Sequence, residues 1–586
     1  MKDLKHTLFK KRFNLPDLRE IVYVTRNMGS IKKILFFTLS IVFLVSAFSI
    51  LVNLNDKLLV ESPSYKGSLK EGIVGTPRFI NPVLAVSDPD RDMVNLIYSG
   101  LMRADNNGGL IKDMAESYEI SEDGLVYTFK LKDNLVWHDN QPITSDDIIF
   151  TIEKTKDPVM KSPKRASWEG VSVDKIDDLT LKFTLKKPYS PFLENTTIGI
   201  LPKHLWSKIT SEQAISSNLN IIPIGSGPYK IGEVKRDSTG IISSYNLIAN
   251  GDFSLGKPFI KKLTLRFYPS ENSLIKAFQG KEIANINAIN PSSVESVKKN
   301  DNTINEISLP RVFGVFFNQN NAKIFAEAEV REALDKAVDR EKIIEEALSG
   351  FGTELYHPIP PRAFGAMKEN NKDSYSLQEA VDILEKNGWK MNEEEGVMEK
   401  KKKNEVLRLS FAISTSDLPE LKKTAELLKV TWESIGAKVD VKIFEIGDLN
   451  QNVIRPRRYD SLLFGEITGR EPDPFVFWHS SQRNDPGLNI AMYTNITADK
   501  LLEEARSTQD KQEREEKYIE FQKEVSKDVP AIFIFSPSFI YITSQELKGP
   551  EKMKEVVTPS ERFSMIHIWY TSTEKVWKSF ANLKLN

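Results

Sequence analysis

The strongest structural signal in the sequence is LRLSFAISTSDLPELKKTAELLKVTWESIGAKVDVKI, residues 407–443. Residues 407–413 alternate between apolar and polar side chains, which is typical of a half-buried strand. Residues 421–435 then repeat their apolar positions with helical spacing, and residues 439–443 alternate again. A strand, a helix and a second strand in this order predict a βαβ unit, so this region should fold as an α/β lobe.

Elements of both kinds continue on either side of this unit. Residues 125–131 and 179–185 alternate with period two and predict antiparallel strands, and Thr144 opens a capping box that should begin a helix. Nearer the carboxyl end, residues 501–527 are predicted to form one long charged helix, and the apolar run 531–535 a buried strand. The body of the chain is therefore predicted to be mixed α/β.

The composition excludes several classes of protein. At about 150 residues per domain, 586 residues predict roughly four folding units. The 80 basic and 81 acidic side chains nearly cancel, so nothing indicates a nucleic-acid partner. The sequence contains no cysteine, which excludes disulfides, a thiol nucleophile and a lipid-modified amino-terminal cysteine.

The amino-terminal region predicts a membrane anchor. Residues 34–54 carry no charge and, as a helix, would span about 30 Å, the thickness of the hydrocarbon core. Residues 1–33 contain nine Lys and Arg against three Asp and Glu, which predicts a cytoplasmic amino terminus and an extracytoplasmic body after a linker at 55–67. Two alternatives stay open: a secretory signal cleaved near Val45-Ser46-Ala47, and a buried helix of a soluble protein.

A search for reactive groups finds no catalytic or metal-binding pattern. The six histidines are not at metal-ligand spacing. Residues 88–92 resemble the start of a calcium loop, but Met93 replaces its glycine and Ser99 its glutamate, so they are predicted to begin a helix. Residues 225–229 come nearest to a nucleophile elbow, yet Pro228 stands where the helix should start. We expect no catalytic residue, no metal and no cofactor.

A series of short motifs follows in order along most of the chain. They are NP (81–82), LIYSGLMR (96–103), MAESY (114–118), YTFKL (127–131), WHDNQPIT (137–144), GSGPY (225–229), FN (317–318), VREAL (330–334), AVDR (337–340) and GW (388–389). Together they resemble the family 5 extracellular solute-binding proteins, the peptide- and nickel-binding receptors of ABC importers. That family usually has Asp-Gly where this chain has Asp139-Asn140. Asparagine tolerates a left-handed backbone, so we expect the same turn.

The resemblance implies an α/β fold with two lobes around a cleft. This is the type II periplasmic-binding-protein-like fold with an extra inserted subdomain, placed here after a transmembrane helix. A hinge between the lobes would close over the ligand. The expected division is lobe I at 68–98, 196–305 and 526–586, the inserted subdomain at 99–195, and lobe II at 306–525.

The resemblance also implies ligand-binding residues. The loop from Ala85 to Asp88 should edge the cleft, and aromatic and polar side chains should line it; these are Tyr229, Asn318, Trp478 and Tyr493. Many peptide binders carry an Ala-Asp-Tyr run whose carboxylate pairs with the peptide's free amine, but this chain has GEITGREPDP at 465–474. Glu466, Glu471 and Asp473 are the candidates there. Purely structural roles stay open for Tyr229, Asn318 and Trp478.

The predicted function is that of a membrane-anchored extracytoplasmic receptor, monomeric and without enzymatic activity. It should capture oligopeptides and deliver them to an ABC transporter permease. One alternative is a chaperone-like or substrate-recruiting protein of the same fold with no import role. Another is a peptide hydrolase. The sequence leaves open whether the ligand is instead a nickel chelate, a sugar or another solute.

Overall fold

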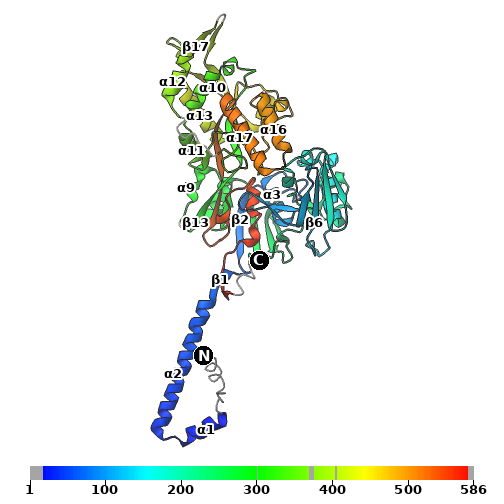
Figure 1. The fold of residues 1–586 in the computed structure, drawn as a ribbon, viewed down its shortest axis with the longest axis vertical. Helices are drawn as coiled ribbons and strands as arrows, with labels where there is room; N and C mark the ends of the chain where they lie inside the picture. Colours follow the sequence, from blue (N-terminus) through cyan, green and yellow to red (C-terminus); the bar gives the residue numbers. More distant parts are fainter. Residues whose placement is uncertain (1–16, 300, 368–374, 403–404, 579–586) are drawn as a thin grey trace, which may run out of the picture. The chain divides into compact units, whose positions relative to one another are not determined.

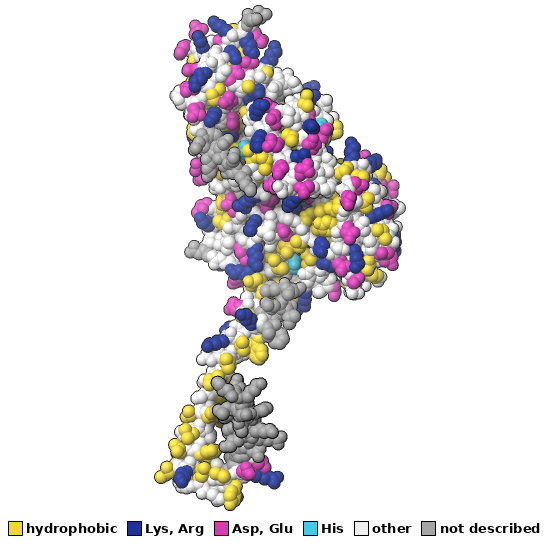
Figure 2. Space-filling model, in the orientation of Figure 1, with side chains coloured by type: hydrophobic (Ala, Val, Ile, Leu, Met, Phe, Trp, Pro, Cys, Tyr) yellow, Lys and Arg dark blue, Asp and Glu magenta, His cyan; other side chains and the backbone are white. Residues whose placement is uncertain are grey.

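The computed structural model of the chain describes residues 17–299, 301–367, 375–402 and 405–578. These residues form two compact units, one of residues 17–64 with 572–578 and one of residues 65–571. Figure 1 traces the chain through both in sequence order. Charges of both signs are interspersed over the face shown in Figure 2, as expected from the near-zero net charge.

The smaller unit contains helices α1 (Leu18–Asn27) and α2 (Ser30–Leu58). Helix α2 is apolar, buries none of its residues and is long enough to cross a membrane, and it contains the predicted segment 34–54. Strand β1 (Leu59–Pro63) follows directly and pairs antiparallel with β23 (Thr573–Trp577). The predicted linker at 55–67 is therefore wrong in its first part, because residues 55–58 complete the helix and the next five form a strand.

Two lobes of the larger unit share one long strand, β22 (Ala531–Ser544). Its first half pairs antiparallel with β14 (Arg311–Phe317) and β15 (Gly352–Glu354), and its second half with β13 (Asn302–Ser308) and β12 (Asn285–Asn287). The chain thus passes between the lobes at 309–310 and again within β22. The predicted boundary at 526 lies too early, because residues 531–535 still pair with lobe II.

In lobe I the sheet continues from β22 and β12 through four more strands, β2 (Ser68–Val74), β11 (Lys262–Tyr268), β10 (Ile242–Ala249) and β9 (Tyr229–Arg236). The helices of this lobe are α3 (Asp88–Ile97), α6 (Lys203–Trp206), α7 (Ser211–Ala214), α8 (Glu271–Gln279) and α9 (Val294–Val297). Helix α3 is capped by Ser87, whose hydroxyl accepts a hydrogen bond from the Asp90 N–H at 3.3 Å. The acidic residues 88–92 therefore start a helix, as predicted.

In lobe II the sheet continues from β14 to β21 (Ser461–Ile467), β19 (Ser410–Ser416) and β20 (Lys438–Phe444). Helix α13 (Pro419–Ser434) joins β19 to β20, which run parallel, so the predicted βαβ unit is confirmed. The other elements of this lobe are α10 (Ala328–Lys336), α11 (Arg340–Leu348), α12 (Leu377–Lys386), α14 (Ile446–Asp448), α15 (Phe475–Trp478), α16 (Ile496–Ser507), α17 (Lys511–Asp528), β16 (Lys390–Asn392), β17 (Val397–Lys402) and β18 (Glu405–Arg408).

The single helix predicted at 501–527 is in fact two helices, α16 and α17. The Asp510 carboxylate accepts a hydrogen bond from the Glu513 N–H at 2.8 Å and so caps a new helix in the middle of the charged run. The turn at 508–510 lets the two helices pack against each other. Helical periodicity alone did not reveal this cap because aspartate is also common on exposed helix faces.

The inserted subdomain has its own sheet, in the order β5 (Ala115–Ile120), β6 (Val126–Leu131), β8 (Thr180–Leu185) and β7 (Val171–Lys175) (Figure 1). Helix α4 (Ser145–Lys156) begins after Thr144, so the predicted strands and helix start are confirmed. Its separate core contains Trp137, Trp168 and Phe183. Asn140 has φ of 66°, which is the left-handed turn expected at this position.

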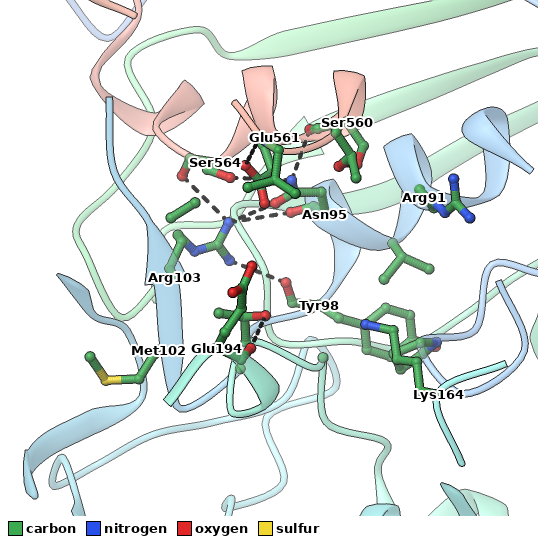
Figure 3. Close-up of a pocket in the computed structure, with 18 of the residues that line it drawn as sticks. Arg91, Asn95, Tyr98, Met102, Arg103, Lys164, Glu194, Ser560, Glu561 and Ser564 are labelled. Carbon is green, nitrogen blue, oxygen red and sulfur yellow. Dashed lines mark hydrogen bonds between the residues drawn. The ribbon is translucent and has the colours of Figure 1, made fainter. Parts of the chain in front are cut away.

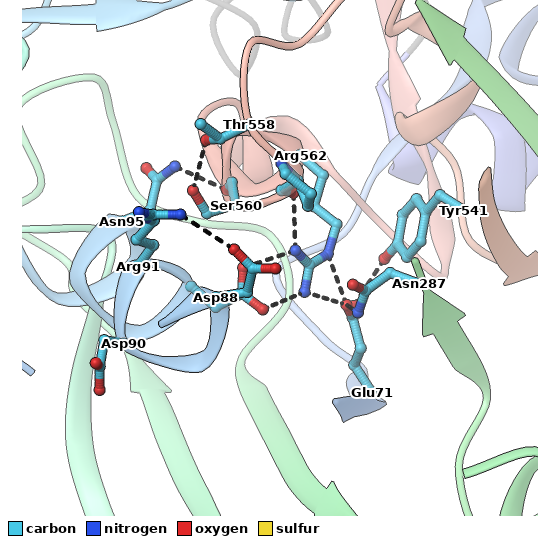
Figure 4. A network of polar contacts seen from close by, with 12 residues as sticks. Glu71, Asp88, Asp90, Arg91, Asn95, Asn287, Tyr541, Thr558, Ser560 and Arg562 are labelled. Carbon is cyan, nitrogen blue, oxygen red and sulfur yellow. Dashed lines mark hydrogen bonds and ion pairs between the residues drawn. The ribbon is translucent and has the colours of Figure 1, made fainter. Parts of the chain in front are cut away.

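Lobe I is built around a fully buried arginine, Arg562, on the 3-10 helix η10 (Pro559–Phe563) (Figure 4). Its guanidinium donates to Asp92 of α3 through two nitrogens, each at 2.7 Å, and to Glu71 of β2 at 2.8 Å. Tyr541 of β22 donates to the second Glu71 oxygen at 2.7 Å, and Asn287 of β12 approaches Glu71 at 3.3 Å. Buried charges are stable only when they are paired and hydrogen-bonded in this way.

Replacing Arg562 should destabilise lobe I strongly. We expect Arg562→Met to lower the free energy of unfolding by about 3–5 kcal/mol, because it leaves the buried Glu71 and Asp92 carboxylates without a counter-charge. The matched control is Arg266→Met, which removes an exposed pair with Glu282 and should cost less than about 1 kcal/mol. Denaturant unfolding followed by circular dichroism measures both. Equal losses in the two variants would show that the buried network does not hold the lobe together.

Candidate functional site

Two adjoining pockets lie where lobe I, the inserted subdomain and lobe II meet. The larger, about 500 Å³, is lined by α3, by residues 100–104 and 194–199, by η10 and by Ile467 at the end of β21 (Figure 3). The smaller, about 260 Å³, lies between the subdomain and residues 467–477 of lobe II. Glu194, Asn195 and Ile467 line both pockets, so the two form one cleft.

One wall of the larger pocket is held by Arg103 (Figure 3). Its guanidinium donates to the Asp113 carboxylate at 2.6 Å, to the Asn95 side-chain oxygen at 3.1 Å and to the Tyr98 carbonyl at 3.2 Å. Asn95 in turn donates to the Ser560 carbonyl of η10 at 2.8 Å. These bonds join α3, the start of the subdomain and the carboxyl-terminal part of lobe I, so Arg103 is occupied with structure rather than free for a ligand.

Arg470 of lobe II reaches across the cleft. Its guanidinium donates to Glu561 of lobe I at 2.7 Å and to the Gly109 carbonyl at 3.2 Å, and its backbone N–H donates to Glu194 of the subdomain at 3.4 Å. Burial raises the pKa of the Glu194 carboxyl, while Arg470 opposes the shift. Arg470 of lobe II therefore connects this lobe to both lobe I and the inserted subdomain.

A second contact across the cleft involves Asp473, which pairs with Arg506 at 2.6 Å. The Arg506 guanidinium lies 4.3 Å from the ring centroid of Phe475 and 5.3 Å from that of Tyr189 in the subdomain. Burial raises the pKa of the Asp473 carboxyl, and Arg506 opposes the shift. Lobe II thus meets the subdomain through a desolvated ion pair with aromatic neighbours.

Four of the predicted site residues lie at or near the cleft. Ala85 lines the larger pocket, and Glu471 and Asp473 line the smaller one, where Glu471 pairs with Arg514 at 2.6 Å. Asp88 is the first residue of α3 and pairs with Arg91 at 3.3 Å, with both side chains about half exposed. Ala85 and Asp88 lie on the lobe I side of the cleft, whereas Asp473 lies on the lobe II side.

Tyr229 lies in the hydrophobic core of lobe I and not in the cleft. Its hydroxyl donates to the Ile260 carbonyl at 3.0 Å. The preceding glycines explain the motif, because a Cβ on Gly225 would lie 1.9 Å from the Ile97 carbonyl oxygen. The Gly227 N–H also donates to that carbonyl at 2.8 Å. The segment 225–229 is a tight turn packed against the end of α3, with a buried tyrosine behind it.

Asn318, Trp478 and Tyr493 are also buried away from the two pockets. The Asn318 side chain donates to the Arg457 carbonyl at 3.0 Å and accepts hydrogen bonds from the N–H groups that follow it, so it ends strand β14. Trp478 packs in the core of lobe II beside Tyr493. The Tyr493 hydroxyl donates to Asp528 at 2.7 Å. The named aromatic candidates thus lie inside the lobe, and the aromatic residues that line the pockets are Tyr98, Trp168, Tyr189 and Phe477.

Glu466 differs from every other charged candidate. It is buried on β21, one residue before Ile467, and neither of its carboxylate oxygens has a hydrogen-bond partner among the described residues. Burial raises the pKa of this carboxyl well above its ordinary value of 4.5. An unpaired carboxylate is costly in such surroundings, so the neutral acid is the stable form.

The structure adds lining residues that the sequence did not single out. Arg91, Lys164, Glu194 and Glu561 line the larger pocket (Figure 3). Arg470 lies inside the segment 465–474 where the family pattern breaks, and that break was the one signal that could have identified it. Lys164 occurs in a basic stretch and Glu194 in a mostly uncharged one, neither with a motif, so only the fold brings them to the cleft.

Replacing Glu466 should change how stability depends on pH. As the pH rises above 4.5, the unfolded chain loses this proton before the folded chain does, so wild-type stability should fall by up to about 1.4 kcal/mol per pH unit until the folded-state pKa is reached. Glu466→Gln keeps a neutral side chain and should be more stable than wild type at pH 7. Thermal unfolding between pH 4 and 8 measures the difference.

The control for this experiment is Glu295→Gln, at a side chain that is 85% exposed. It should leave the pH profile of stability unchanged, since exposed groups contribute little. Parallel profiles for wild type and Glu466→Gln would contradict the interpretation that Glu466 is an unpaired buried acid.

Removing Arg470 should let the lobes separate. Because the chain has no native cysteine, a spin-label pair can be attached at Lys298→Cys in lobe I and Lys500→Cys in lobe II. We expect Arg470→Gln to lengthen the distance between the labels in the ligand-free protein. Arg483→Gln is the control, since the hydrogen bonds of this side chain among the described residues go to Ser480 and Thr494 within lobe II. An unchanged distance distribution would show that Arg470 does not hold the lobes together.

The cleft offers binding groups of both charges. Among the described residues that line the two pockets there is no histidine. No group of three His, Cys, Asp or Glu side chains within the described ranges is placed to hold a metal ion. Arginine, lysine and carboxylate side chains suit the binding of a small polar molecule that carries both charges.

Comparison with known proteins gives the same fold and organisation. The oligopeptide-binding protein AppA of Bacillus subtilis is 28% identical over 507 residues, which cover 85% of this chain and 91% of AppA. The structure of AppA in complex with a nonapeptide has a TM-score of 0.65 at 27% identity, covering 87% of this chain and all of that one. The structure of NikZ from Campylobacter jejuni in complex with Ni(L-His) has a TM-score of 0.67 at 28% identity, covering 86% and 99%.

The family match covers most of the larger unit. The family described as bacterial extracellular solute-binding proteins, family 5 (middle) matches residues 109–488, which include most of the subdomain, the second piece of lobe I and most of lobe II. The two-lobed, periplasmic-binding-protein-like fold expected from the sequence is thereby confirmed. The chain belongs to the family 5 bacterial extracellular solute-binding proteins.

Proposed function

We propose that this protein is an extracytoplasmic receptor that captures short peptides between its lobes and delivers them to an ABC transporter permease. The observation that supports this function best is the cleft, because its walls come from both lobes and the subdomain. A ligand that touches all three parts stabilises the closed state, and the permease can read that state. AppA, which has the same fold, binds a nonapeptide.

The proposed ligand-binding residues follow from the placement of the side chains. Ala85 and Asp473 line the cleft, and Asp88 lies at its rim. Glu466 lies behind Ile467 and can pair with a ligand's cation only if β21 shifts. Four further candidates act by holding the walls from inside the lobes: Tyr229, Asn318, Trp478 and Tyr493.

The proposed location is the outer side of a membrane, with α2 as a single-pass anchor and residues 1–33 in the cytoplasm. The length and apolar surface of α2 support this role. A cleaved signal is the alternative, and the intact mass of the mature protein distinguishes the two. We expect the receptor to act as a monomer, without catalysis and without a bound cofactor.

Binding of peptides to the full chain tests the function. We expect alanine peptides of three to nine residues to bind the detergent-solubilised protein in isothermal titration calorimetry, and to shorten the distance between spin labels at Lys298→Cys and Lys500→Cys, because closure brings the lobes together. Native mass spectrometry identifies any ligand that purifies with the protein. A nickel chelate as that ligand, with no peptide binding, would favour the type of ligand seen in NikZ.

Two other results would overturn the proposal. Appearance of cleavage products during the incubation would indicate a hydrolase. Binding of unfolded chains alone, without a change in the distance between the lobes, would indicate the chaperone-like alternative.

A further inference from the structure

Two cations on one side of the larger pocket lack a buried counter-charge. The Lys164 ammonium, just before the 3-10 helix η2 (Arg165–Trp168), has no ion pair or hydrogen bond with any residue in the described part of the chain. Among the same described residues, Arg91 on α3 pairs with Asp88 alone, at 3.3 Å, where both side chains are about half exposed. Figure 3 shows both cations on the side of the pocket opposite Arg103 and Glu194.

The other charges that line this pocket already have partners. Arg103 pairs with Asp113 at 2.6 Å. Glu561 accepts from Arg470 at 2.7 Å and from the Val557 N–H at 2.8 Å, and Glu194 accepts from the Arg470 N–H. Arg91 and Lys164 therefore have no carboxylate of their own inside the cleft.

The surroundings make this arrangement unfavourable without a ligand. Lys164 is accessible from the pocket, yet the walls around it and the nearby charge of Arg91 lower the pKa of its ammonium, while Glu561 and Glu194 oppose the shift. Two like charges that line one pocket repel each other, although their exposure to solvent screens part of the repulsion. An anion between them would remove this cost and would form charge-assisted hydrogen bonds with both.

We infer that Arg91 and Lys164 form a clamp for a carboxylate of the ligand. This inference rests on the proposed function and names the part of the peptide that is recognised. Arg91 belongs to lobe I and Lys164 to the inserted subdomain, so the carboxylate would join these two parts. Glu194 and Glu561 on the opposite wall already accept hydrogen bonds from Arg470, so the clamp recognises the anionic part of the ligand alone. The ligand class is thus a short peptide with a free carboxylate, supplied by its carboxyl terminus or by an acidic side chain.

The test uses three peptides and the full-length protein. The peptides are Ala-Ala-Ala, its carboxyl-terminal amide, and the amide of Ala-Ala-Asp. We expect the amide of Ala-Ala-Ala to bind at least about tenfold more weakly than the free acid, because it loses the charge-assisted hydrogen bonds of the clamp. Tight binding of Ala-Ala-Asp amide assigns the clamp to any carboxylate, and weak binding assigns it to the carboxyl terminus.

Matched variants assign the effect to the two residues. Arg91→Gln with Lys164→Gln should weaken binding of the free acid to the level of the amide and should reduce its dependence on salt. Arg165→Gln is the control, because Arg165 is the exposed neighbour of Lys164 and lines neither pocket. Equal binding of acid and amide to the wild type would overturn the clamp and leave the proposed function intact. Binding of none of the three peptides, nor of longer ones, would overturn both.

Discussion

The buried ion network around Arg562 is the constraint on which lobe I depends. It joins Glu71 near the start of the body to Asp92 on α3, Tyr541 on β22 and Arg562 on η10. Glu71 and Asp92 near the start of the body meet Tyr541 and Arg562 near its end, across 470 to 491 residues of sequence, and each segment carries a group that is costly to bury alone. In the arrangement observed, each of these buried polar groups has a hydrogen-bond or ion-pair partner. The network therefore selects the register in which the first and last pieces of the body meet.

The same network determines what faces the cleft. Because Arg562 points into the core, its neighbour Glu561 is left at the pocket and meets Arg470 from the other lobe. Asp92 likewise anchors α3, while Asn95 on that helix donates to Ser560 and forms part of the pocket wall. Binding groups are thus held by a helix and a short 3-10 turn that cannot move separately. Such support from a rigid inner layer is what a site needs to keep its geometry.

Much of the fold could be predicted from local patterns, but the site could not. Residues 407–443 showed their two strands and one helix because each buries one face with its own period. Asn140 was correctly expected to adopt a left-handed backbone, since its side chain tolerates that conformation. The cap at Asp510 escaped prediction because one aspartate divides the charged run into two helices without changing its helical period. The passage of β22 between the lobes escaped prediction because the strand continues past the apolar run that ends at residue 535. Lys164 and Glu194 reach the cleft only through tertiary folding.

The cleft is lined by other residues than the aromatic ones expected there, because Trp478 and Tyr493 lie in the core of lobe II. Trp478 and Tyr493 fill the core of lobe II, where their large apolar area stabilises the lobe. The cleft is lined instead by other aromatic residues, among them Tyr98 and Tyr189, together with arginine, lysine and carboxylate side chains, and closing it removes these charges from water. Arg470 with Glu561 and Arg506 with Asp473 offset that cost by pairing. Charges without a partner still oppose closure, because removing them from water costs free energy. A ligand that brings the missing counter-charge offsets this desolvation cost and shifts the equilibrium toward the closed state. An apolar ligand of the same size leaves the desolvation cost in place.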